Sequence, residues 1–217
     1  MLALEFLDRT RSLASVITDL FTAAQLQIGD RWHVGEATSE DEYRVSQAIA
    51  TAAEALRPPT SGLGDSQPRA LLATLPGEAH DLGLHLIRLA LVEDGWDVEV
   101  APAMELEELV DTARRHRVDL VAISSTYDRG GGGMLLATVI RSVHSIGLPV
   151  LVGGAAFARS PHLAEESGAD AVGGDARLAV ILARRLKNTS RGRPPSRRVP
   201  RPPAADRPSR ARPLKDL

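Results

Sequence analysis

The feature that most constrains this chain is a regular alternation of short apolar runs and amphipathic segments over residues 69–187. The apolar runs cover residues 70–75, 96–100, 119–124, 148–154 and 169–173. The amphipathic segments follow them near residues 79–93, 104–115, 133–145, 160–167 and 175–187. Neighbouring parallel strands need crossover connections, which are usually helices that return right-handed over the sheet. The alternation therefore predicts an α/β domain in which helices cover both faces of a five-stranded parallel sheet.

A separate helical segment precedes this pattern. Apolar residues recur at steps of three and four from Leu13 to Leu26, as in a helix that buries one face. A second helix is expected from Thr38, which can cap the first turn, to Leu56. A stretch rich in Pro, Gly and polar residues then separates this segment from the first strand, as a linker would. The expected domains are a helical cap (1–56), a linker (57–69), a flavodoxin-like α/β domain (70–187) and a tail (188–217).

The predicted tail differs from the rest of the chain in charge and composition. It carries nine Lys and Arg against two Asp, so its net charge is about +7, whereas the whole chain carries −2. Few apolar residues are available to offset the entropy lost on ordering, so a disordered Pro/Arg-rich tail is expected. Such a tail attracts any polyanion. Nucleic acid, an acidic partner and the acidic remainder of the chain are alternative targets, and a solvated tail without a fixed partner is another possibility.

The composition also excludes several kinds of site. The 217 residues include no cysteine, which excludes disulfides, thiolate metal ligands and cysteine nucleophiles. The first residues, MLALEFLDRTRS, carry charges too early for a signal peptide, and no apolar run approaches the roughly 20 residues of a membrane span. We therefore expect a cytoplasmic protein that does not enter a membrane.

Polar residues and glycines follow the predicted strands where ligand-binding loops converge. In open parallel sheets, ligands bind beyond the carboxyl ends of the strands. Three of these ends supply Glu78, His80, Gly83, Ser124, Thr126, Gly153 and Gly154. An imidazole on such a loop can bind a metal, and a neighbouring carboxylate can hold its other ring nitrogen. The glycines let a bulky ligand approach the backbone, while the hydroxyl groups offer hydrogen bonds without adding charge.

Each of these groups has a plainer interpretation when it is taken alone. A histidine at a helix start is more often exposed without a ligand, and a Gly-Gly pair more often forms a turn or a helix cap. Only the order and placement of the groups together favour a shared site. The glycines at 130–133 do not form a phosphate loop, because no Gly-Lys-Ser/Thr follows them, and we expect a flexible connection near the ligand.

Together these motifs resemble the cobalamin-binding domain family, with its D/E-x-H-x-x-G, S-x-L/T and GG signatures. Here they are Glu78-x-His80-x-x-Gly83, Ser124-x-Thr126 and Gly153-Gly154. The resemblance covers residues 69–187 and implies that His80 replaces the cofactor's own base as the lower cobalt ligand. It also implies that Glu78 orients His80 and that the remaining motif residues line a channel for the displaced nucleotide tail. The implied cofactor is cobalamin, as adenosylcobalamin or methylcobalamin.

The helical segment resembles the cap of the CarH-like adenosylcobalamin photoreceptors, which carries a W-x9-E-H stretch. Trp32 and Glu42 match its first two residues, which surround the upper face of the cofactor in that family. The family histidine, which can occupy the upper cobalt position after illumination, is Tyr43 here. A phenol is a much poorer ligand near neutral pH. No helix-turn-helix segment precedes the cap, so DNA recognition is not expected.

These resemblances imply a regulatory sensor that is not an enzyme. It would respond to light through adenosylcobalamin and would act by oligomerisation or through a partner protein. The alternative is a corrinoid methyl-carrier protein of a methyltransferase system, in which the motif usually continues with Gly-Lys-Asn. Here Gly83 is followed by Leu84 and His85, which weakens that alternative. A mutase subunit is less favoured, because the chain contains no substrate barrel.

Overall fold

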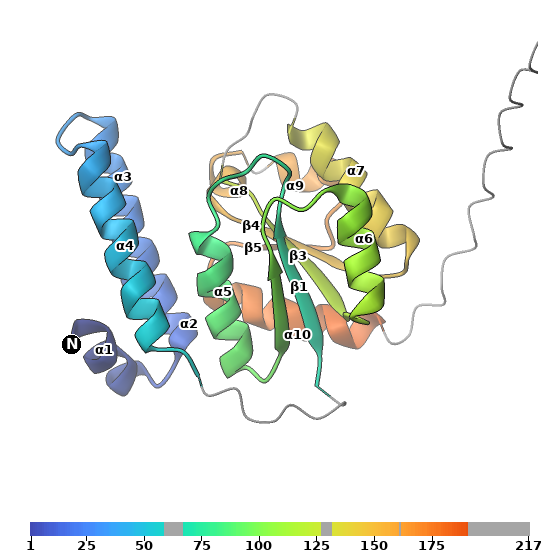
Figure 1. Ribbon diagram of the computed structural model, residues 1–217, viewed down its shortest axis with the longest axis horizontal. Coiled ribbons are helices and arrows are strands. Elements are labelled where there is room, and N and C mark those ends of the chain that lie inside the picture. Colours follow the sequence, from blue (N-terminus) through green and yellow to red (C-terminus); the bar gives the residue numbers. More distant parts are fainter. Residues whose placement is uncertain (59–66, 127–131, 161, 191–217) are drawn as a thin grey trace, which may run out of the picture.

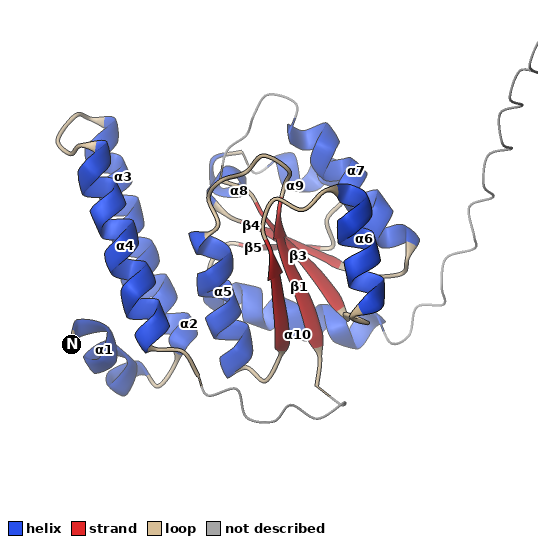
Figure 2. Cartoon of the chain, viewed as in Figure 1, coloured by secondary structure: helices blue, strands red, loops and turns tan. Residues whose placement is uncertain are grey.

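The computed structural model describes residues 1–58, 67–126, 132–160 and 162–190. Its centre is a parallel sheet of five strands in the order β2-β1-β3-β4-β5, which confirms the predicted flavodoxin-like architecture (Figure 2). The strands are β1 (Arg69–Thr74), β2 (Asp97–Ala101), β3 (Leu120–Ser124), β4 (Val150–Gly153) and β5 (Ala171–Gly173). Leu72 of β1 pairs with Val100 on one side and with Ala122 on the other. The strand order therefore reverses at β1, and the crevice between the carboxyl ends of β1 and β3 is the expected ligand position.

Helices cover both faces of the sheet. Side chains alternate along each strand, so Leu71 and Ala73 face one layer while Ala70 and Leu72 face the other. The first layer contains α6 (Leu106–Arg115), α7 (Gly132–Ser145), α8 (Ala155–Arg159) and α9 (His162–Ser167). The second contains α5 (Leu82–Glu93) and α10 (Ala176–Ser190). Burial on both faces explains why the strands form nearly continuous apolar runs in the sequence.

The cap consists of a helical rod and a returning helix (Figure 1). Its elements are α1 (Leu2–Thr10), α2 (Leu13–Val16), the π-helix η1 (Ile17–Thr22), α3 (Ala23–His33) and α4 (Ser39–Ala55). Arg11, in a left-handed conformation, ends α1, and the Ser12 side chain caps α2 by accepting the N–H of Ser15. The expected helix through Leu13–Leu26 is thus a continuous rod with a π-helical section that the apolar spacing did not indicate.

The predicted start of α4 at Thr38 is confirmed. The Thr38 hydroxyl accepts the N–H of Asp41, and the Asp41 carboxylate accepts the N–H of Thr38, which together form a capping box. The hydrogen bond from the Thr38 side chain, followed by the one from its backbone, lowers the pKa of Asp41 below its usual value. The box fixes the point at which the chain reverses between α3 and α4.

The base of the cap packs firmly against the α/β domain, whereas its end projects. Apolar side chains of the cap share one core with side chains of α5 and α10. The cap contributes Leu13, Val16, Ile17, Phe21, Ile49, Ala53 and Leu56, α5 contributes Leu86, Leu89 and Ala90, and α10 contributes Ala176. Arg177 donates two hydrogen bonds of 2.8 Å to Asp19, and the N–H of Leu13 donates to both carboxylate oxygens of Glu93. The α3–α4 connection lies at the same end of the molecule as the carboxyl ends of the strands (Figure 1).

The main differences from the expected element boundaries lie at three places. The helix after β1 begins at Leu82 rather than near residue 79, so the His80 motif lies on a loop. The helix expected at 160–167 is preceded by the additional short helix α8, and α10 continues three residues beyond 187. The remaining tail, most of the linker and glycines 130 and 131 lie outside the described residues. None of the helices in the described ranges combines the length and apolar character that a membrane crossing requires.

Candidate functional site

A tight turn at the end of β1 positions the first motif. The N–H of Glu78 donates to the carbonyl oxygen of Leu75 at 3.0 Å, and Gly77 has a φ of +76°. Pro at the second position and Gly in a left-handed conformation at the third are the residues that a type II turn requires. The turn redirects the chain over the edge of the sheet, and therefore places Glu78 and His80 next to the end of β3.

Glu78 holds the ring and the backbone of His80 together. Its Oε1 accepts hydrogen bonds from His80 Nδ1 at 2.8 Å and from the N–H of His80 at 3.1 Å. Its Oε2 accepts the N–H of Thr126, in the loop after β3, at 3.1 Å. Glu78 is 6% exposed, whereas the His80 side chain is 54% exposed. Because Nδ1 is held by Glu78, a metal bound by this imidazole would be bound through Nε2.

The Glu78 carboxylate remains ionised in this environment. Burial raises its pKa, but the hydrogen bonds from the His80 ring, from the N–H of Thr126 and from the N–H of His80 lower it. Together these hydrogen bonds outweigh burial, so the pKa of Glu78 lies below its ordinary value. An ionised acceptor requires Nδ1 to carry the proton, so in the neutral imidazole the lone pair lies on Nε2.

The three motifs meet around the hydroxyl group of Ser124. A Cβ atom at Gly83, in the first turn of α5, would lie 3.7 Å from Ser124 Oγ. A Cβ atom at Gly154 would lie 3.1 Å from the same oxygen. The expected juxtaposition of the strand ends is therefore present. A side chain at either glycine would occupy space next to this hydroxyl, so the arrangement fits a ligand segment that passes close to the backbone.

The Gly-Gly pair also has a packing role that the sequence did not indicate. Gly154 has a φ of +102°, and a Cβ there would lie 2.4 Å from the carbonyl oxygen of Ser125. The N–H of Ser125 donates to Gly153 and its carbonyl accepts from Ala156, so the ends of β3 and β4 are tied directly together. A Cβ at Gly153 would lie 3.1 Å from the carbonyl oxygen of Gly173. Close strand packing therefore requires glycine at position 154 and favours it at position 153, while their contact with a ligand stays a prediction.

The residues present suit a corrinoid: an imidazole locked by a carboxylate, exposed at the switch point of the sheet, beside glycines and a hydroxyl group. The sequence model of the B12 binding domain matches residues 68–183, which is more than half of the chain. This chain belongs to the B12-binding domain family. Its cofactor is accordingly a cobalamin or a related corrinoid.

Solved structures support the fold of this B12-binding protein beyond the matched residues. The monomethylamine corrinoid protein of Methanosarcina barkeri has a TM-score of 0.70 and 22% identity, covering 85% of this chain and 89% of that chain. A cobalamin-binding protein from Desulfitobacterium hafniense DCB-2 has a TM-score of 0.50 and 20% identity, covering 80% and 82%. The methanol:cobalamin methyltransferase complex MtaBC of M. barkeri has a TM-score of 0.51 and 13% identity, covering 84% and 70%. At these identities the likeness establishes the fold.

The cap residues predicted to face the cofactor lie near the α3–α4 connection. Trp32 is in the last turn of α3, is 51% exposed, and donates from Nε1 to Ser39 Oγ at 3.2 Å. It is therefore not a buried aromatic anchor between two helices. Glu42, in the first turn of α4, accepts a 3.0 Å hydrogen bond from Ser46 and is partly buried. Among the described residues, the side-chain hydrogen bonds of Trp32 and Glu42 lie within the cap.

Tyr43 lies on the outer side of the hairpin. Val45 packs against the core that the cap shares with α5 and α10, whereas Tyr43 is 61% exposed. Residues two apart on a helix are about 200° apart, so these two side chains point in nearly opposite directions. In this conformation Tyr43 is directed away from the α/β domain.

Sequence reasoning missed Arg159. This residue ends α8, and its Nη2 donates to the carbonyl oxygen of Thr126 at 2.7 Å. A helix of five residues gives too little periodicity to be detected, and no motif contains the arginine. A signal was nevertheless available, because a cation follows Gly154 by five residues on the predicted ligand side of the sheet.

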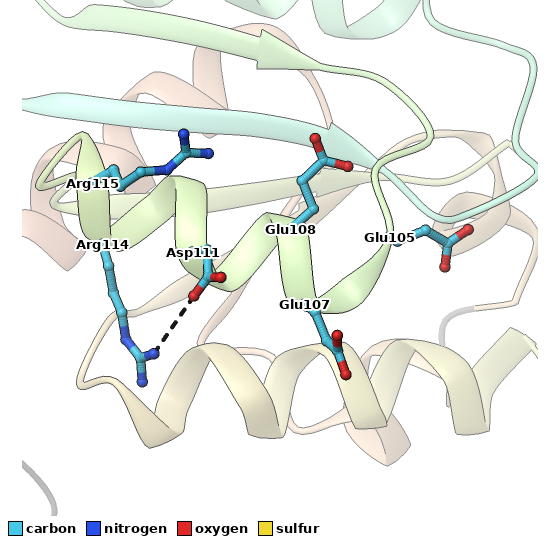
Figure 3. Close-up of a pocket in the computed structure, with 6 residues that line it drawn as sticks. All are labelled: Glu105, Glu107, Glu108, Asp111, Arg114 and Arg115. Carbon is cyan, nitrogen blue, oxygen red and sulfur yellow. Dashed lines mark ion pairs between the residues drawn. The ribbon is translucent and has the colours of Figure 1, made fainter.

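A separate hollow of about 720 Å³ lies along α6 of the B12-binding domain (Figure 3). Its lining residues are Glu105, Glu107, Glu108, Asp111, Arg114 and Arg115. Arg114 pairs with Asp111 at 3.8 Å, and the pair is exposed. All of the lining residues have charged side chains and none belongs to the three motifs, so this hollow is not part of the candidate site.

Proposed function

We propose that this protein is a cytoplasmic, cobalamin-dependent sensor without catalytic activity. It responds to light through adenosylcobalamin and signals to a regulatory partner or to a second copy of itself. The observation that supports the proposal is the exposure of Trp32 on the projecting end of the cap. That end lies at the same end of the molecule as the loop between β1 and α5 (Figure 1), and His80 belongs to this loop. An exposed tryptophan there offers a large apolar surface to a flat ligand.

Contacts at the base of the cap support a restricted movement. The Asp19–Arg177 ion pair and the Glu93–Leu13 hydrogen bonds hold the base of the cap to α10 and α5. The last turn of α3 and the first turn of α4 have no comparable contacts in the part of the chain that the structure describes. A change at the ligand's upper face would therefore alter the packing of the hairpin end, while the base remains docked.

The residues of the chain have distinct tasks in this scheme. Adenosylcobalamin supplies a cobalt–carbon bond that visible light breaks. His80, oriented by Glu78, would hold the cobalt from below, and the Gly83–Ser124–Gly154 cluster would receive the nucleotide tail. Trp32 and Glu42 would contact the upper ligand, and loss of that contact would change how much of the hairpin end is buried.

Scattering in darkness and under light tests the proposal. The purified protein loaded with adenosylcobalamin should change its small-angle scattering profile or its oligomeric state after green illumination. Trp32→Ala should still bind the cofactor but lose this response. Leu26→Ala, which removes another exposed apolar side chain of α3, serves as the matched control and should respond like the wild type. Identical profiles and oligomeric states in darkness and light would contradict light sensing.

A methyl-carrier function is the second candidate. The observation that favours it is the TM-score of 0.70 with the monomethylamine corrinoid protein, over 85% of this chain. The sequence after the motif favours the sensor instead. In carriers the motif usually continues with Gly-Lys-Asn, whereas here Gly83 is followed by Leu84, which is 2% exposed and packs in the core. A carrier should bind methylcobalamin at least as tightly as adenosylcobalamin and pass methyl groups to a thiol with a partner enzyme. Comparing the two affinities in darkness separates the candidates.

A further inference from the structure

Arg159 joins two loops at the ligand edge of the sheet. It ends α8, the short helix that follows Gly153 and Gly154, and its Nη2 donates to the carbonyl oxygen of Thr126 at 2.7 Å. Thr126 follows β3, so this hydrogen bond links the segment after β4 to the segment after β3. The bond is charge-assisted, and such bonds are stronger than those between neutral groups.

Thr126 is held at both of its backbone groups. Its carbonyl oxygen accepts from Arg159, and its N–H donates to Glu78 Oε2 at 3.1 Å. The other oxygen of Glu78 accepts from His80 Nδ1 at 2.8 Å. A continuous series of hydrogen bonds therefore leads from the guanidinium through one residue and one carboxylate to the imidazole.

Packing does not require this arginine. Ala156 and Phe157, on the same helix, are buried in the core of the first helical layer, whereas the side chain of Arg159 is exposed. Arg159 is exposed and donates to Thr126, the residue whose N–H holds Glu78. Its position therefore suits the orientation of Glu78 and His80 rather than the stability of the core.

We infer that Arg159 is a positioning residue for His80. By fixing Thr126, it keeps the Thr126 N–H on Glu78 Oε2, and Glu78 in turn keeps the imidazole in one orientation. The helix α8 begins directly after Gly154 and ends at Arg159. A shift of the Gly-Gly turn would therefore move Arg159 and, through the same hydrogen bonds, the imidazole of His80. This inference rests on the proposed ligation of cobalt by His80.

Electron paramagnetic resonance of the cobalt(II) form tests the inference. Protein labelled uniformly with heavy nitrogen is loaded with unlabelled cobalamin and reduced. Heavy nitrogen from the protein then splits the cobalt signal into doublets, whereas nitrogen of the cofactor's own base splits it into triplets. The variants are Arg159→Ala, Arg159→Lys and the control Arg114→Ala, which removes an exposed arginine of α6.

The wild type and Arg114→Ala should show the doublet. In Arg159→Ala the ratio of protein-ligated to other cobalt should fall by about threefold to tenfold, at or below the lower end of the effects known for residues behind a metal ligand, because Arg159 acts through two further residues. Arg159→Lys keeps a donor on a stem of similar length and should restore most of the doublet. Unchanged melting temperatures of the ligand-free variants would separate positioning from loss of fold.

Three results would overturn the inference, and they can be told apart. A doublet of wild-type intensity in both Arg159 variants would show that His80 is oriented without Arg159, while ligation by His80 stands. A wild-type spectrum with triplets would exclude His80 as the ligand and would remove the basis of the inference. A melting temperature that falls in parallel with the doublet in both variants would assign Arg159 a purely structural role.

Discussion

Glu78 fixes the orientation of the His80 imidazole: Nδ1 lies 2.8 Å from Oε1, and the same carboxylate accepts the N–H of Thr126. Glu78 is buried and ionised, while the ring it holds is largely exposed. A buried anion that orients an exposed imidazole is an arrangement found behind metal ligands. Two residues separated by one alanine therefore form a single hydrogen-bonded unit at the edge of the sheet.

Replacing Glu78 should weaken cofactor binding. Glu78→Gln keeps the size of the side chain but removes the charge that fixes the His80 tautomer, so we expect corrinoid affinity to fall by about 10-fold to 100-fold. Equilibrium binding of cobalamin, followed by absorbance, measures the effect. Glu105→Gln, on the charged surface of α6, is the matched control and should bind like the wild type. Equal affinity of the two variants would mean that Glu78 does not support the ligand.

Replacing His80 should remove the lower protein ligand. His80→Ala should still bind cobalamin through the remaining contacts, but the absorbance and paramagnetic spectra should lose the contribution of a protein imidazole. His85→Ala tests specificity, because His85 is also exposed, lies five residues away and pairs with Asp81 at 3.6 Å. The prediction fails if both variants keep the wild-type spectrum, or if both lose it.

Glycine at position 154 should be essential for the fold itself. Gly154→Ala combines an unfavourable φ with a Cβ only 2.4 Å from the carbonyl oxygen of Ser125, so the clash adds to the strain of about 1–3 kcal/mol expected from the backbone alone. Gly168→Ala is a matched comparison, because Gly168 has a φ of +75° but no atom within 4 Å of the added Cβ. Denaturant unfolding of the ligand-free proteins should therefore show a clearly larger loss of stability for Gly154→Ala. Similar losses would argue that β3 and β4 can separate to accommodate the methyl group.

The sequence predicted the elements that are determined by burial and periodicity. Strands such as β1 have a continuous apolar centre, Ala70 to Ala73, because both faces are buried, and α4 begins where Thr38 can form a capping box. The helix α8 was not predicted, because five residues are too few for a distinct apolar repeat. The apolar repeat across η1 predicted a helix there but did not indicate its π-helical hydrogen bonding. The three motifs could be placed at one edge because parallel strands end together.

The contacts behind the motifs were not predictable in the same way. Thr126 acts through its backbone N–H, which every residue except proline possesses, so its side chain gave no indication of this role. Ser124 was recognised through its hydroxyl, but the close approach of Gly154 depends on a backbone angle. Long-range contacts of this kind follow from the completed fold rather than from local pattern.

Loosening the base of the cap should increase the mobility of the cap without unfolding the α/β domain. Asp19→Asn removes the charge from a partly exposed ion pair with Arg177, and such pairs contribute about 0.2–1 kcal/mol. Amide hydrogen exchange should therefore become faster in α2 and η1, while exchange in the central strands stays unchanged. Glu40→Gln breaks a pair that lies within α4 and should leave exchange at the base of the cap unaffected. Faster exchange throughout the sheet would instead show that the cap and the α/β domain unfold as one cooperative unit.

Acid should destabilise the ligand-free protein through Glu78. Its pKa is lower in the folded protein than the ordinary value of 4.5, so the folded state favours the ionised form. The corresponding stability is present above the ordinary pKa and is lost as pH falls through the folded pKa, because the unfolded chain binds the proton first. Unfolding free energies measured from neutral to acidic pH should decline less steeply in Glu78→Gln than in the wild type. Parallel pH profiles would mean that the hydrogen bonds from His80 and Thr126 do not favour the charged carboxylate in solution.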